Sequence, residues 1–556
     1  MRQRKRTIGW LAVLLVFVFA ATACGSDTEA SIDTDVLGAT AVSEDTAMAE
    51  DAALSEDTDV AEDAALSEDT ASDEGTTADA DSALAAQTLR VALQFGPDAG
   101  LAIETDDASV LVKAAVVEGL VRSDASGQPV PELAESWQRI DDTTWEFSLR
   151  PDVVFHDGST FDAAAVDTAI SYISGVASPP RSLGGLTLTT EIVDDLTVRI
   201  ATSDPDPILP LRLSGRSMGI LAPAAYASQP TEPIGTGPFA VADFTPPDSL
   251  TVERFDDYWG EVAQLDGAEF RFIPDAGARA AAIRAGEVDV ADGIAIPDLQ
   301  AIEQDADVEL IRFSLPRTAS LYTNTMNGPM SDPIVREAVS LAVDEVSIAE
   351  NLLEGQFAPA RSYFGDENAW APQRNVDPAD ATEQAAALLD GVDAEGRSIS
   401  IWTYSSRPEL PDIATVVQAQ LQAAGFEVDI EVGDYTPLEE RVFNGEHDLF
   451  PLSRGYYFDI ADAGSVLSSD FTCEGGYNLN LFCADSFDAL VKELDAADST
   501  SDRQAVFGEA AQMLLDEFVG IPLVHDRARY AARANVAGLI IDPFESVLLT
   551  PQISLN

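Results

Sequence analysis

A polar and aromatic segment at 453–459 carries the residue types of a ligand-binding site. It reads Ser-Arg-Gly-Tyr-Tyr-Phe-Asp and follows a predicted strand at 447–452. In open α/β sheets, ligands bind beyond the carboxyl ends of the strands. In a closed cleft Asp459 could pair with a ligand cation, and Tyr456 and Tyr457 could add cation–π attraction and apolar contact. The alternative is that Asp459 is a solvated loop carboxylate, one of 97 acidic side chains in the chain.

The cysteines Cys473 and Cys483 are ten positions apart and predict a local disulfide if the protein is exported. Such a bond would hold the loop that contains Tyr477 and Asn478 beside the candidate site. The alternative is metal capture, but there is no C-x-x-C pair and no histidine nearby, so we expect no metal site. The remaining candidate ligand-binding residues are Arg454, Asn478 and Phe95.

A competing site is centred on Ser217. The segment 215–219 reads Gly-Arg-Ser-Met-Gly and matches the G-x-S-x-G pattern of serine hydrolases, with His447 and His525 downstream. That pattern requires a strand before the serine and a helix after it, whereas this segment lies among prolines and predicts a loop. We therefore expect no catalytic residue, and a secreted serine hydrolase using Ser217 is the alternative of another class.

The composition excludes several partners. The chain has 556 residues, 97 acidic and 31 basic side chains, and a net charge of −66. A surface this negative repels phosphates, so nucleic acid is not an expected partner. There is no P-loop pattern, and we expect no cofactor. The length exceeds what a single hydrophobic core usually serves, which indicates at least two lobes.

The N-terminal 86 residues resemble an export signal followed by a linker. Basic residues in 1–7 and an apolar run at 8–21 fit a signal peptide, because the run is too short to span a membrane. The small residues before Cys24 resemble a lipoprotein signal ending at residue 24, with lipid on Cys24. The segment 25–86 has no Lys or Arg, is rich in Asp, Glu and Ala, and predicts a disordered acidic tether. The predicted location is extracytoplasmic, anchored to the outer face of the cell membrane.

The remaining residues predict an α/β fold. Alternating apolar residues predict strands at 89–95, 145–149 and 197–200. Asp162 and Asp332 are suited to start helices, the second followed by proline at the first helical position. A strand at 399–401, a helix ending at Gly425 and a strand at 426–432 form a βαβ unit, so these strands should be parallel.

Several short segments together resemble the oligopeptide- and dipeptide-binding family of extracytoplasmic solute-binding proteins of ABC importers, solute-binding family 5. The resemblance covers 88–556 in the family's order and spacing. The segments that carry it are 118–121 (EGLV), 131–137 (PELAESW), 145–150 (WEFSLR), 155–158 (FHDG), 235–239 (GTGPF), 257–260 (DYWG), 286–289 (GEVD) and 335–339 (VREAV).

The resemblance implies a two-lobed clamp of the periplasmic-binding-protein type II (class C) fold, with mixed sheets and an extra subdomain in lobe I. Lobe I would comprise 87–313, completed by 525–556, and lobe II would comprise 314–524. In peptide-binding members a Gly-Trp-x-x-Asp segment supplies the aspartate that pairs with the peptide's ammonium group. Here 455–459 matches it, with Tyr456 in place of the tryptophan.

The implied function is the capture of peptides or peptide-like solutes by a monomer, for delivery to ABC permease subunits. Ligands known among relatives provide the alternative: a nickel chelate, an oligosaccharide or an opine in the same clamp. A nickel-type site is expected to place metal-ligating or arginine groups at the cleft instead of Asp459.

Overall fold

The computed structural model describes residues 87–376 and 380–556. The predicted signal peptide at 1–24 with Cys24, and the acidic segment at 25–86, lie outside the described residues. Among the residues that are described, no helix has the length and apolar character of a membrane span.

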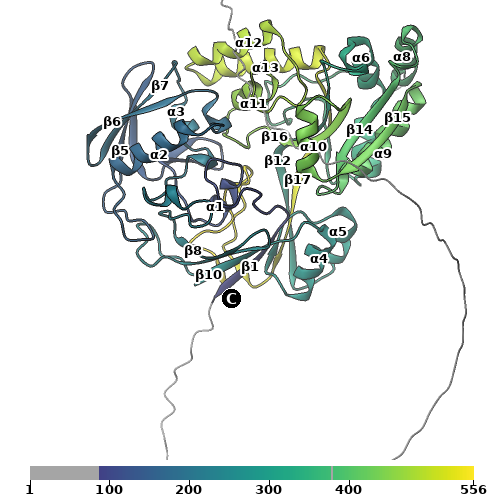
Figure 1. Cartoon of the computed structure of the whole chain (residues 1–556). Helices are drawn as coiled ribbons and strands as arrows, with labels where there is room; N and C mark the ends of the chain where they lie inside the picture. The colour runs from purple at the N-terminus through teal and green to yellow at the C-terminus, as the bar shows by residue number, and fades with distance from the viewer. Residues whose placement is uncertain (1–86, 377–379) are drawn as a thin grey trace, which may run out of the picture. The chain divides into compact units, whose positions relative to one another are not determined.

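Two long strands, β12 (Val308–Thr323) and β17 (Gly520–Arg533), pair antiparallel in the middle of an eleven-stranded mixed sheet. The order of its main path is β15-β14-β16-β12-β17-β11-β1-β10-β9-β8. The register of the central pair shifts between Ser314 and Thr318. The predicted lobe boundaries, 313/314 and 524/525, fall inside these two strands. Figure 1 shows that the strands run between the two halves of the described chain.

The other strands are β1 (Thr88–Leu93), β2 (Val121–Ser123), β3 (Pro129–Pro131), β4 (Ala134–Arg139), β5 (Thr144–Leu149), β6 (Leu188–Asp194), β7 (Thr197–Thr202), β8 (Phe239–Thr245), β9 (Ser249–Arg254), β10 (Gly267–Phe272), β11 (Val290–Ala291), β13 (Ala358–Pro359), β14 (Ser398–Tyr404), β15 (Glu427–Gly433), β16 (Leu449–Gly455), β18 (Val536–Ala537) and β19 (Ser554–Leu555). The α-helices are α1 (Ala108–Lys113), α2 (Ala163–Gly175), α3 (Leu209–Arg212), α4 (Ala276–Ala285), α5 (Ile296–Glu303), α6 (Pro333–Ala342), α7 (Glu345–Ser347), α8 (Ala381–Leu388), α9 (Glu409–Ala424), α10 (Tyr435–Phe443), α11 (Ala463–Phe471), α12 (Asp485–Lys492) and α13 (Thr500–Asp516).

Lobe I is built around one large hydrophobic cluster. Buried side chains of β1, β9 and β10 belong to this cluster. It carries a separate four-stranded antiparallel sheet, β4-β5-β7-β6, against which α2 packs. This sheet forms the extra subdomain. Leu548, Leu549 and Ile553 from the C-terminal segment belong to the same cluster, so both ends of the described chain contribute to one core.

Lobe II contains two further clusters. One surrounds β14, β15 and α9, and the other surrounds α11, α12 and α13. The strands β14 and β15 pair in parallel along their length, which confirms the predicted βαβ unit. Gly425 ends α9 with a φ of 104°, a conformation that glycine adopts without a Cβ clash.

The predicted helix starts are also confirmed. The Asp162 side chain accepts hydrogen bonds from the backbone N–H groups of Ala164 and Ala165 at the start of α2. Asp332 accepts one from Ile334 at the start of α6, where Pro333 occupies the first turn. Both carboxylates bind N–H groups that have no partner inside the helix, which is why these residue types favour such positions.

Candidate functional site

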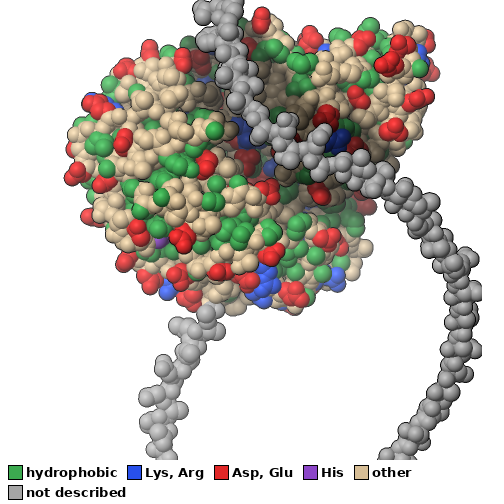
Figure 2. All heavy atoms as spheres, viewed as in Figure 1, with side chains coloured by type: hydrophobic (Ala, Val, Ile, Leu, Met, Phe, Trp, Pro, Cys, Tyr) green, Lys and Arg blue, Asp and Glu red, His purple; other side chains and the backbone are tan. Residues whose placement is uncertain are grey.

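A cavity of about 920 Å³ lies between lobe I and lobe II. Its lobe I wall is formed by 104–106, the loop 176–185, Arg216 and Ser217, and its lobe II wall by Phe458, Asp459 and parts of 468–476. Figure 2 shows the hollow between the lobes. This volume lies within the range of small-molecule binding sites, so we take the cavity as the candidate site.

Asp459 lies on the lobe II wall, in the turn that follows the end of β16 at Gly455, and the residues of β16 are almost all buried. The turn that carries it is held on both sides. The Tyr456 backbone N–H donates to the carbonyl oxygen of Pro316 at 2.9 Å, and Asp462 forms a two-contact ion pair with Arg503 at 2.6 and 2.8 Å. These anchors fix where the Asp459 carboxylate meets the cavity.

The Asp459 carboxylate already has two cationic partners. Arg454 of lobe II donates to it at 3.1 Å, and the Nε atom of Arg181 in lobe I donates to both of its oxygens at 3.3 and 3.4 Å. Burial raises the pKa of this carboxyl, but the charges of Arg181 and Arg454 outweigh that effect and leave its pKa below the usual value. Asp459 is therefore negatively charged at neutral pH but is not a lone charge.

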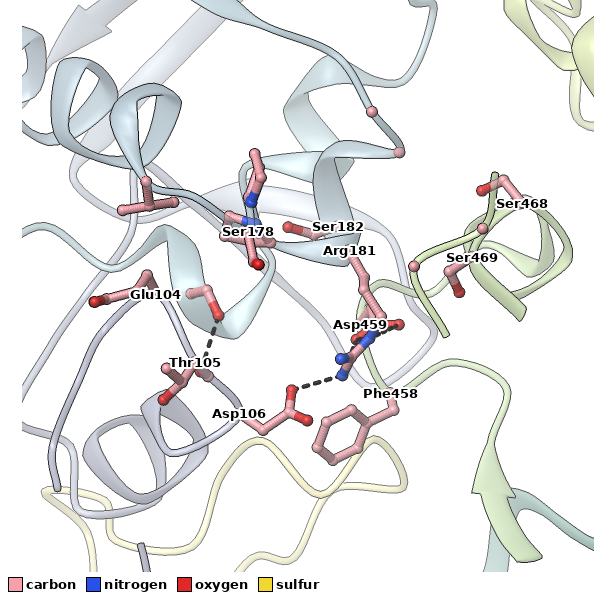
Figure 3. Close-up of a pocket in the computed structure, with 18 of the residues that line it drawn as sticks. Glu104, Thr105, Asp106, Ser178, Arg181, Ser182, Phe458, Asp459, Ser468 and Ser469 are labelled. Atoms are coloured by element: carbon pink, nitrogen blue, oxygen red, sulfur yellow. Dashed lines mark hydrogen bonds and ion pairs between the residues drawn. The ribbon is translucent and has the colours of Figure 1, made fainter. Parts of the chain in front are cut away.

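Arg181 reaches the cavity from the loop between α2 and β6. It begins a short 3₁₀ helix, Arg181–Leu183, in which Leu183 is fully buried in the lobe I cluster. Arg212 donates a hydrogen bond to the carbonyl oxygen of Ser182 at 3.0 Å, which stabilises the loop. In Figure 3 the Arg181 side chain extends toward both Asp459 and Asp106, to which its Nη2 atom donates at 2.6 Å.

A second arginine, Arg216, lines the same cavity and is 8% exposed. Its guanidinium stacks over the ring of Phe458 at 3.8 Å and donates to the carbonyl oxygens of Phe458 and Phe544. Burial lowers the pKa of this arginine. The cavity therefore has cationic groups on its lobe I side as well as an anionic group on its lobe II side.

The other predicted site residues of the 453–459 segment lie behind the cavity wall. Tyr456 is 4% exposed and its hydroxyl donates to Glu367, while the Tyr457 hydroxyl donates to Asn368 at 2.7 Å. Arg454 binds Asp470 at 2.8 Å in addition to Asp459. None of these three side chains lines the cavity, and their direct contact with a ligand stays a prediction.

Asn478 and Phe95 also lie away from the cavity wall. The Asn478 amide donates to the carbonyl oxygens of Thr472 and Phe482, at 2.9 and 2.6 Å, and so braces its own loop. Phe95 is 48% exposed and lines a smaller cavity of about 70 Å³, where the guanidinium of Arg407 is 5.7 Å from its ring centroid.

Cys473 and Cys483 are joined by a disulfide bond. The loop that it closes contains Glu474, Gly475 and Gly476, which form part of the lobe II wall of the cavity. The bond therefore constrains a segment that borders the candidate site.

Ser217 lines the cavity but lacks the setting of a hydrolase nucleophile. It lies in a 3₁₀ helix, Arg216–Met218, and its hydroxyl donates to the carbonyl oxygen of Thr105 at 3.2 Å. Within 87–376 and 380–556, no histidine lines this cavity. His156 contacts the carbonyl oxygen of Gly237, and His525 contacts the hydroxyl of Thr318.

Apart from Ser217 as a candidate nucleophile, no residue of the lobe I wall was predicted from the sequence, and Arg181, Arg216 and Asp106 were given no ligand-binding role. A weak signal was present, since both arginines lie in loops rich in proline and glycine in a chain with few basic residues. Nothing in their spacing connects them with Asp459, because Arg181 and Asp459 are 278 positions apart. In the described part of the chain, no group of three or more His, Cys, Asp or Glu side chains is arranged to hold a metal ion.

The chain is similar to known proteins over most of its length. The family of bacterial extracellular solute-binding proteins, family 5, matches residues 128–478. A probable di/tripeptide-binding protein 5 of Pseudomonas aeruginosa is 29% identical over 503 residues, which cover 83% of this chain and 94% of that protein.

Two solved structures show the same two-lobed fold. NikA from Staphylococcus aureus in complex with Ni(L-His)2 has a TM-score of 0.77 and 23% identity, and the likeness covers 84% of this chain and all of the other. A dipeptide-binding protein from Pseudoalteromonas sp. SM9913 in complex with Met-Leu has a TM-score of 0.76 and 22% identity. This likeness also covers 84% of this chain and all of the other. The match to the family model covers more than half of the chain, and the chain therefore belongs to the bacterial extracellular solute-binding proteins, family 5, the substrate-binding components of ABC importers.

Proposed function

We propose that this protein captures short peptides or peptide-like solutes that carry a free ammonium group, for import by an ABC transporter. The ligand would be enclosed between lobe I and lobe II by hinge closure around β12 and β17. Its ammonium group would pair with Asp459, and its backbone would be bound by main-chain hydrogen bonds that do not depend on side-chain identity.

The observation that carries this proposal is the position of Asp459. Its carboxylate is charged, its side chain is 10% exposed, and it faces a cavity that both lobes line. A buried ligand cation needs such a partner, because an unpaired charge in a closed cleft costs several kcal/mol. The 29% identical relative from Pseudomonas aeruginosa, described as a probable di/tripeptide-binding protein, adds support.

The proposal predicts a preference for free amino termini. A mixture of tripeptides of random sequence should bind at least about fivefold more tightly than the same mixture after N-acetylation, because acetylation removes the cation that Asp459 would meet. Isothermal titration calorimetry on the full-length protein measures both affinities. Equal affinity for the two mixtures, or no binding of either, would overturn the proposal.

A second candidate ligand is a metal chelate that carries carboxylates. It is favoured by Arg181 and Arg216, since guanidinium groups bind carboxylates well and both line the same cavity. NikA of Staphylococcus aureus, whose structure contains Ni(L-His)2, shares the fold. The test is titration with nickel and two equivalents of L-histidine. If the protein binds this chelate and neither peptide mixture, the metal chelate replaces the peptide as the proposed ligand.

We further propose that the protein acts as a monomer tethered to the outer face of the cell membrane by lipid on Cys24, with 25–86 as the tether. Buried acyl chains supply the membrane affinity of such anchors. Cells grown with radiolabelled palmitate should incorporate label into the parent protein but not into Cys24→Ser. Label of equal intensity in both proteins would contradict lipidation of Cys24.

A further inference from the structure

Five charged side chains of alternating sign connect the two lobes, and three of them, Asp106, Arg181 and Asp459, line the cavity. In lobe II, Asp470 binds Arg454, and Arg454 binds Asp459. The series then crosses to lobe I, where Arg181 binds Asp459 and Asp106. Apart from Asp106, these side chains are at most 22% exposed. The Arg181–Asp459 contact is the step at which the series passes from one lobe to the other.

Arg181 already occupies one of the positions from which a cation in the cavity could contact Asp459. Its guanidinium contacts the Asp459 carboxylate at 3.3 Å, as Figure 3 shows, and both residues line the cavity. Asp459 cannot offer its full charge to an incoming ammonium group while this contact persists. A ligand cation must therefore displace Arg181 or share Asp459 with it.

The surrounding contacts keep the electrostatic free-energy cost of displacing Arg181 small. When Arg181 leaves Asp459, it keeps its 2.6 Å contact with Asp106, a residue of its own lobe whose side chain is 62% exposed. Asp459 keeps Arg454, and Arg454 keeps Asp470. No buried charge is left without a partner, which is the outcome that makes the breaking of buried ion pairs costly.

We propose that Arg181 is an internal counter-charge that holds Asp459 until a ligand cation takes its place, and that this contact is one of those that hold the two lobes together. This exchange makes Arg181 a specificity-determining residue. Solutes without a cationic end cannot replace it and are rejected, while solutes with one exchange with it. The exchange with ligand depends on the proposed function, whereas the contact between the lobes does not.

The lobe contact is tested without any ligand. Small-angle X-ray scattering of the ligand-free full-length protein should give a larger radius of gyration for Arg181→Gln than for the parent, because the variant loses the ion pair between the lobes that borders the cavity and keeps only others such as Arg139–Asp498. Arg199→Gln is the matched control, since Arg199 binds Glu146 and Glu191 within the lobe I sheet. Circular dichroism checks that each variant is folded. An unchanged radius of gyration for Arg181→Gln would overturn the proposal.

The exchange is tested with the random tripeptide mixture. Arg181→Gln should bind it about threefold more tightly than the parent, because an internal competitor is removed. Asp106→Asn should bind it more weakly, because Arg181 then loses its second partner, and this loss should vanish in the Arg181→Gln background. Weaker binding by Arg181→Gln would make Arg181 a ligand contact and overturn its role as competitor. If neither the parent nor any of the variants binds the peptide mixture, the proposed function fails. The scattering result then decides by itself whether Arg181 holds the lobes in contact.

Discussion

Asp459→Asn should weaken binding of the free tripeptide mixture by at least about tenfold, equivalent to about 1.4 kcal/mol. Asparagine has the size of aspartate but no charge, so a ligand cation enclosed between the lobes would lose its counter-ion. The folded protein should tolerate the change, because Arg454 retains Asp470 and Arg181 retains Asp106. Calorimetric titration of parent and variant measures the effect, and circular dichroism confirms folding.

The matched control for this substitution is Glu474→Gln. Glu474 lines the same cavity from lobe II, but it is exposed to solvent. Water screens an exposed carboxylate, so its loss should change the affinity by less than about twofold. Equal affinities of parent and Asp459→Asn, or equal losses in both variants, would remove Asp459 from its proposed role.

Glu132→Gln should make the protein more stable than the parent at pH 8, on the order of 4 kcal/mol, and leave it nearly unchanged at pH 4. Burial of the carboxyl group, with the neighbouring charge of Glu118, raises the pKa of Glu132 from 4.5 to about 8. Between these values the unfolded chain releases a proton that the folded protein retains. The free energy of unfolding of the parent therefore falls as the pH rises through this window, and a neutral glutamine removes that fall.

Urea unfolding of both proteins between pH 4 and pH 8 tests this prediction. Glutamine can still accept the 2.8 Å hydrogen bond from the Gly119 backbone N–H, so the local contact survives. Glu135→Gln is the control, because Glu135 lies in the same segment and its side chain is 53% exposed. A difference between parent and Glu132→Gln that does not vary with pH would contradict a raised pKa for Glu132.

Much of the fold could be predicted from local patterns. Period-two alternation predicted β1, β5 and β7, and side-chain capping predicted the starts of α2 and α6. The βαβ unit of lobe II was predicted with its parallel pairing. These features depend on residues that are neighbours in the chain, so the sequence carries the information directly.

The candidate site could be predicted only in part. The motif and its position after a strand indicated Asp459, and the structure has this residue on the cavity wall. Tyr456 and Tyr457, expected to form an aromatic wall, do not line this cavity. Their hydroxyls donate to Glu367 and Asn368 in a neighbouring loop. Side-chain direction at the end of a strand depends on packing partners that come from elsewhere in the chain.

The sequence by itself indicated the family, several of the strands and helices, and Asp459 as the candidate anionic residue of the site. Only the tertiary structure decided that this charge is shared, because the loop that bears Arg181 and the turn that bears Asp459 meet across 278 positions of chain. Electrostatic interaction depends on distance in space, and no local pattern records which distant loop will supply the opposite charge.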